Sequence, residues 1–192
     1  MDRQSRSRQL LVLAGVAAAV AVGLAATPPA VPIPPLNQKV LEFTRERICK
    51  KVADGQCISL AVEAVRFAGA KHYPFDPSGD YVWGRPIASF KEALPGDILQ
   101  FRNAVFQGKR WITKRRWVSW HHEYPHHTAI VSEVREGGMV VAILHQNVGA
   151  HEDDDAKKQV VQEGSIRPES LQPGGSVAIF RPAARDERET RR

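Results

Sequence analysis

The stretch Asp54-Gly55-Gln56-Cys57, with the run from Ile58 to Ala68 behind it, decides the fold of this chain. Gly55-Gln56 is a turn signal, and apolar side chains then recur along one helical face. This face comprises Leu60, Ala61, Ala64, Val65 and Ala68. The pattern predicts a helix over 57–70 that begins at Cys57, where unpaired backbone N–H groups and the positive end of the helix dipole favour a thiolate.

A candidate base and a residue that orients it follow in two later strands. His127 opens a strand-like stretch, 127–134, and Asn147 follows a second one, 140–146. Gly137-Gly138 between them predicts an antiparallel hairpin, which would place His127 beside Asn147. We therefore interpret Cys57 as nucleophile, His127 as general base and Asn147 as the group that holds the imidazole in one tautomer.

Each of these residues also fits a structural role. A free cysteine often packs as a small hydrophobe, and His127 alone fits the surface or the end of a strand. A disulfide between Cys49 and Cys57 would make Cys57 inert as a nucleophile. We expect none, because Cys49 falls within a first predicted helix, 37–52, and its geometry toward Cys57 is not constrained by the sequence.

Taken together, these motifs resemble the CHAP group of cysteine, histidine-dependent amidohydrolases and peptidases. The resemblance covers about residues 37–182. Within this group, the chain is similar in particular to a compact variant found in bacteria and at the terminus of some fungal actin-patch adaptor proteins. It rests on Gly55-Gln56-Cys57 before a helix, Leu94-Pro95-Gly96-Asp97-Ile98-Leu99-Gln100-Phe101, His127-Thr128-Ala129-Ile130-Val131 and His145-Gln146-Asn147.

The resemblance implies the same roles for Cys57, His127 and Asn147. Cell-wall members often have a glutamate where this chain has His145, so a fixed negative charge near the base is missing. The backbone N–H of Cys57 is the expected oxyanion donor, because no side-chain donor is obvious. The residues expected to contact substrate are Gln56, Trp83, Lys114, Trp117 and His145.

The order of elements predicts an α+β fold. Two helices, 37–52 and 57–70, come first, and strands follow at 97–101, 111–119, 127–134, 140–146 and 176–181. We expect a papain-like cysteine peptidase fold, with the N-terminal helices packed on a curled antiparallel sheet. Asp97, after the turn at Pro95-Gly96, is expected to accept backbone N–H bonds and to be structural.

Residues 109–120 concentrate basic and aromatic side chains. Their alternation predicts a hairpin arm with five basic residues and three tryptophans. The tryptophans fit either sugar rings or a membrane interface, and the basic groups would attract carboxylates or phosphates. The alternative is that the tryptophans cover the core beneath a solvated charged face.

The two ends of the chain predict where it acts. Residues 1–26 combine arginines with an apolar run and small residues, as in a secretory signal peptide or an uncleaved signal anchor. Residues 27–36 read as a proline-rich linker, 37–182 as one domain and 183–192 as a charged disordered tail. We expect an exported protein, periplasmic or extracellular, or one held at the membrane by its N-terminal segment.

These features lead to one expected function and one alternative. The expected function is an exported cysteine-dependent amide hydrolase that acts on peptidoglycan or another envelope peptide linkage through a Cys57 acyl-enzyme. The alternative is a non-catalytic module that keeps the fold and binds an envelope polymer or a protein. We expect no metal and no cofactor, since the histidines match no recognised ligand spacing. The net charge of +6 does not by itself indicate nucleic acid, and export argues against it.

Overall fold

The computed structural model describes residues 31–71, 80–149 and 154–184. The expected signal segment, residues 27–30 of the linker and residues 185–192 of the tail lie outside these ranges. No helix within them is long and apolar enough to cross a membrane. The elements are helices α1 (Pro35–Arg45), α2 (Cys57–Ala68) and α3 (Asp155–Lys158), short helices η1 (Glu136–Gly138) and η2 (Pro168–Ser170), and strands β1 (Arg85–Ile87), β2 (Ile98–Thr113), β3 (Arg116–Arg135), β4 (Val140–His145), β5 (Gln162–Ile166) and β6 (Ser176–Arg181).

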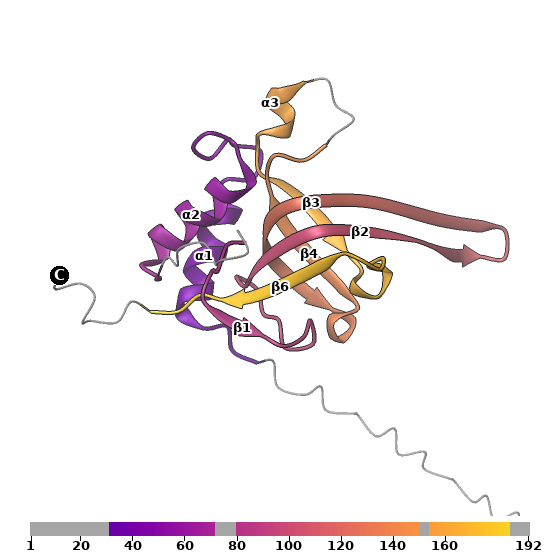
Figure 1. Ribbon diagram of the computed structural model, residues 1–192, viewed down its shortest axis with the longest axis horizontal. Helices are drawn as coiled ribbons and strands as arrows, with labels where there is room; N and C mark the ends of the chain where they lie inside the picture. Colours follow the sequence, from indigo (N-terminus) through magenta and orange to yellow (C-terminus); the bar gives the residue numbers. More distant parts are fainter. Residues whose placement is uncertain (1–30, 72–79, 150–153, 185–192) are drawn as a thin grey trace, which may run out of the picture. The chain divides into compact units, whose positions relative to one another are not determined.

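The strands form one antiparallel sheet in the order β1-β6-β2-β3-β4-β5, with α1 and α2 against one of its faces (Figure 1). This is the predicted α+β class. The predicted hairpin of 127–134 with 140–146 is confirmed, since β3 pairs with β4 across η1. The strand predicted at 176–181 is β6.

Alternation along the strands divides the core between the two faces of the sheet. Ile98, Ile130 and Leu144 pack with the apolar sides of α1 and α2. Their strand neighbours Leu99 and Val131 pack in a second cluster on the opposite face. Successive side chains of β3 therefore face α2 and this second cluster in alternation.

The strands change face at one point in the long hairpin of β2 and β3. Phe101 and Ala104 lie in the same cluster although they are three positions apart, and Tyr124 packs with them. Strict alternation would place Phe101 and Ala104 on opposite faces. The change occurs at Asn103, whose φ is 47°, between the register pairs that flank it.

Three element boundaries differ from the sequence prediction. Helix α1 ends at Arg45 instead of 52, because Cys49 takes a φ of 62° and Ile48 and Lys51 form bridges with the segment before β5. The expected strands 97–101, 111–119 and 127–134 are parts of β2 and β3, which run without interruption to the tip of the hairpin. The sequence analysis missed β1, which is three residues long, and β5, whose stretch is short and polar.

Candidate active site

Cys57 is the first residue of α2, as the sequence predicts, and the turn before it is built locally. Gly55 has a φ of 87°, and a Cβ there would lie 2.7 Å from the Cβ of Gln159. The Asp54 carboxylate accepts the Gln56 N–H (3.0 Å) and the Ser59 hydroxyl (2.6 Å). These contacts hold Gln56 in an extended backbone conformation, and the helix therefore starts at Cys57.

The end of β4 holds this turn in place. Gln146 is fully buried, and its amide accepts the Val52 N–H (3.2 Å) and donates to the carbonyls of Val52 (3.1 Å) and Gln56 (2.7 Å). Asn147 donates from Nδ2 to Oε1 of Gln56 (2.8 Å). Both residues therefore position the Cys57 turn.

Within the described residues Asn147 makes no contact with His127, so the predicted contact is corrected. Strand β4 ends at His145, and Asn147 has a φ of 60° while its N–H bonds the carbonyl of Lys158. The hairpin pairing therefore stops before it reaches His127. The side chain of Asn147 turns to Gln56 instead.

His127 lies on the face of β3 that points away from α2. It is buried against Phe101 and Tyr124, with its ring stacked on Tyr124 at 5.0 Å, and its Nε2 lies 3.1 Å from Nδ1 of His145. Burial and the neighbouring His145 lower the pKa of His127 to about 3. The imidazole is therefore neutral at pH 7, and no hydrogen bond joins it to Cys57 in the described part of the chain.

The pKa of the half-buried Cys57 thiol is raised, because burial disfavours the thiolate. The backbone N–H groups of Thr128 and of the helix start act in the opposite direction but are outweighed. The start of α2 thus lowers the pKa of Cys57, as expected, but burial raises this pKa by more. The hydrogen bond from the backbone of Thr128 also means that the Cys57 sulfur lies beside the backbone of β3.

A second histidine lies on the α2 side of β3. His126 precedes His127, and its ring packs at 5.7 Å from Tyr81, which belongs to the α2-side core. Burial and the nearby Cys57 raise the pKa of Tyr81. Nε2 of His126 lies 3.2 Å from Oδ1 of Asp80.

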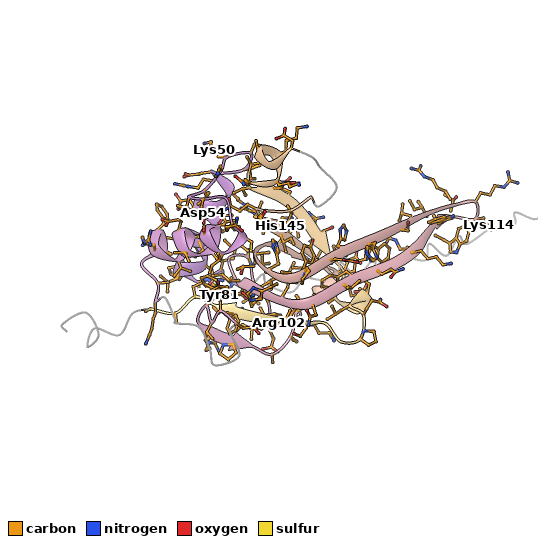
Figure 2. All side chains as sticks on the ribbon, turned by 45° about the horizontal axis from the view of Figure 1, so that its top comes forward. Lys50, Asp54, Tyr81, Arg102, Lys114 and His145 are labelled. Atoms are coloured by element: carbon orange, nitrogen blue, oxygen red, sulfur yellow. The ribbon has the colours of Figure 1, made fainter. Side chains whose placement is uncertain are left out.

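Arg102, which pairs with His126 across the two strands, also binds Asp80, through Nε (3.1 Å) and Nη2 (2.8 Å). Figure 2 labels Tyr81 and Arg102 beside the base of the β2–β3 hairpin. The sequence analysis missed His126 and Asp80. The adjacent histidine pair was a signal for His126, but Asp80 carries no periodicity that would have revealed it.

The residues predicted to contact substrate are scattered. Gln56 is exposed beside Cys57, whereas Trp83 is buried and donates from its indole to Gln100 (3.3 Å). His145 is buried beside His127. Lys114 lies at the far end of the β2–β3 hairpin (Figure 2), and Trp117 is the second residue of β3, beside the same turn.

Two other features of the sequence bear on the chemistry of the site. Cys49 and Cys57 are both free thiols, as expected. Among the described residues, no group of three or more histidine, cysteine, aspartate or glutamate side chains is arranged to hold a metal ion.

A helix that begins at a cysteine and packs on a six-stranded antiparallel sheet defines the class of cysteine proteinase-like folds. Residues 36–190 match the family model of the AIM3/BBC1 cysteine proteinase-fold domain, and the chain belongs to this family. The resemblance to the domain of fungal actin-patch adaptor proteins is thereby confirmed. Neither a curated protein nor a solved structure matches the chain.

The buried amide of Gln146 gives a direct test of how the Cys57 turn is held. Gln146→Ala removes three hydrogen bonds and leaves the buried N–H of Val52 without a partner, which we expect to cost about 2–4 kcal/mol of unfolding free energy. Asn147→Ala is the control, because that side chain is exposed and should cost under about 1 kcal/mol. Urea unfolding measures both, and equal losses would contradict the assignment.

Proposed function

We propose that this domain is a cysteine-dependent amide hydrolase in which His126, and not His127, takes the proton of the Cys57 thiol. The observation that supports the proposal is the placement of the His126–Asp80 pair on the same side of β3 as Cys57. Exposed His126 is free to turn its ring toward a substrate, whereas His127 is locked in the opposite core. Hydrogen bonds of catalytic pairs are often long before substrate binds.

The geometry of His126 suits a general base. Because the Asp80 carboxylate can only accept, Nε2 of His126 carries its hydrogen and Nδ1 is left to receive the thiol proton. Arg102 in turn fixes the carboxylate. Burial raises the pKa of Cys57, so the thiol needs a base beside it to take its proton during attack.

The proposed reaction proceeds in two steps. The sulfur of Cys57 attacks the carbonyl carbon of the amide, and the C–N bond breaks as the amine leaves with the proton from His126. Water then attacks the thioester, gives a proton to His126 and releases the acid, which regenerates the thiol. The backbone N–H groups at the start of α2 are the nearest donors for the oxyanion.

We further propose a peptide or amide linkage of an envelope polymer, such as peptidoglycan, as the substrate. This part of the proposal is supported by the resemblance to CHAP enzymes and by the secretory pattern of residues 1–26. It is independent of the choice of base.

A non-catalytic binding module is the second candidate function. The observation that favours it is the raised pKa of Cys57, together with the lack of a hydrogen bond between Cys57 and any histidine in the part of the chain that the structure describes. Such a module would bind its partner equally well after Cys57→Ala. A hydrolase would lose turnover after the same substitution.

The rate of alkylation of Cys57 by iodoacetamide as a function of pH separates the two functions. The measurement uses a Cys49→Ser chain, so that Cys57 is the single thiol. We expect His126→Ala to slow the reaction at pH 7 about tenfold, since general-base assistance from the imidazole is lost. His127→Gln serves as the matched control and should change the rate less than about twofold. Equal rates in all three chains would favour the binding module.

A further inference from the structure

The far part of the β2–β3 hairpin is a two-stranded ribbon without a third strand. Strand β6 pairs with β2 only over 98–102, and β4 pairs with β3 only over 130–135. Residues 107–121, here named the arm, therefore extend beyond the sheet (Figure 1). The side chains at the end of the arm make few contacts with the rest of the described domain.

The arm carries exposed apolar surface. Four of the seven large hydrophobic side chains exposed in the described ranges lie on it: Trp111, Ile112, Trp117 and Val118. Trp111 and Trp117 are direct cross-strand partners, with exposures of 62% and 53%. Trp120 alone of the three arm tryptophans is partly covered, and its indole donates to Ser170 (3.0 Å). The tryptophan pair therefore faces solvent and does not cover the core.

The charged side chains of the arm are all basic. Lys109, Arg110, Lys114, Arg115 and Arg116 are all exposed, and none of them makes an ion pair among the described residues. No acidic residue occurs between Asp97 and Glu123. A partner for this surface must therefore be anionic.

We propose that the arm docks on an anionic phospholipid bilayer. Indole rings favour the boundary between headgroups and acyl chains, and lysine and arginine side chains bind phosphates while their stems lie along the apolar layer. Trp111 and Trp117 lie opposite each other and share one face of the ribbon with Lys109, whereas Val118, paired with Arg110, lies on the other face. The turn itself is charged, so the arm lies along the surface with the tryptophan pair facing the lipid and does not insert tip first.

This surface acts independently of the proposed hydrolase. Cys57 and His126 lie outside the arm, so the proposed thiol chemistry uses none of the arm side chains. Cys57→Ala should therefore leave lipid binding unchanged. A failure of lipid binding would likewise leave the hydrolase proposal intact.

Partition of the full chain into vesicles of phosphatidylglycerol and of phosphatidylcholine tests the proposal. We expect Lys114→Gln/Arg115→Gln/Arg116→Gln to weaken binding to phosphatidylglycerol about a hundredfold at low salt. The matched control is Lys39→Gln/Lys50→Gln/Lys91→Gln, which removes the same charge from exposed lysines elsewhere and should change binding less than about threefold. Any binding through residues 1–30 is common to both chains.

Quenching of tryptophan fluorescence by brominated phosphatidylglycerol gives a local readout. We expect strong quenching in the unsubstituted chain and its loss in Trp111→Ala/Trp117→Ala, since Trp83 and Trp120 are shielded in the fold. Equal binding by the two charge variants, or no quenching, would overturn the proposal. Binding to peptidoglycan that the arm variant loses, with vesicle binding unchanged, would overturn it in favour of an acidic polymer.

Discussion

Asp97→Ala lowers the free energy of unfolding by about 3–5 kcal/mol, among the largest losses that we expect from one substitution in this domain. Asp97 is fully buried, and its Oδ1 accepts from Nδ2 of Asn37 (2.7 Å) and Nε of Arg181 (2.9 Å). Its Oδ2 accepts from the N–H of Leu94 and from Nη2 of Arg181, both at 2.8 Å. One carboxylate thus joins α1, the turn before β2, and β6.

The cost arises mainly from the partner that alanine leaves behind. The Arg181 side chain is 16% exposed, and without Asp97 its guanidinium stays partly buried and uncompensated. Asp97→Ala/Arg181→Met should therefore be less destabilised than the two single losses added together. Urea unfolding of the three chains measures this coupling. An additive cycle, or a loss below about 1 kcal/mol for Asp97→Ala, would contradict the structural role.

Local signals account for what could be predicted from the sequence around Cys57 and Asp97. A turn, an apolar stripe and a helix start lie within a few residues of Cys57, so α2 and the position of its thiol follow from nearest neighbours. The Pro95-Gly96 turn similarly marks the entry into β2. Alternating basic and aromatic residues predicted the hairpin of the arm.

The choice between His126 and His127 could not be made in the same way. Adjacent residues of a strand face opposite sides, so a shift of one position exchanges the exposed imidazole of His126 for the buried one of His127. Because the strands change face at Asn103, alternation counted from the core does not give the face on which an arm residue lies. The place of Asn147 depended on where β4 stops pairing, and Asp80 joins the site from a connecting segment with no regular pattern.

Acidification from pH 7 to pH 5 should destabilise the domain by about 2 kcal/mol for each of His127 and His145. Burial lowers the pKa of His127 to about 3 and that of His145 to about 4, and charge repulsion from His145 on His127 and from His122 on His145 adds to the lowering. The unfolded chain binds protons on these histidines below about pH 6.5, whereas the folded chain does not. Stability is therefore full above pH 6.5 and falls as the pH drops toward 4.

Unfolding in urea at a series of pH values measures this slope. His145→Gln removes one of the two groups and should roughly halve the part of the slope between pH 6.5 and 5. His121→Gln is the control, because His121 is exposed and its substitution should leave the slope unchanged. Gly164 packs against His145, and a Cβ at position 164 would lie 2.8 Å from Nε2, so the buried ring of His145 requires a glycine at 164.

The same slope decides the role of His127 in the proposed chemistry. A histidine that stays neutral down to about pH 3 cannot hold the thiol proton at pH 7, because its conjugate acid is far too strong. A flat profile between pH 6.5 and 5 would mean that His127 and His145 titrate normally in the folded chain. Their ring pair would then be open to solvent, and His127 would return as the candidate base in place of His126.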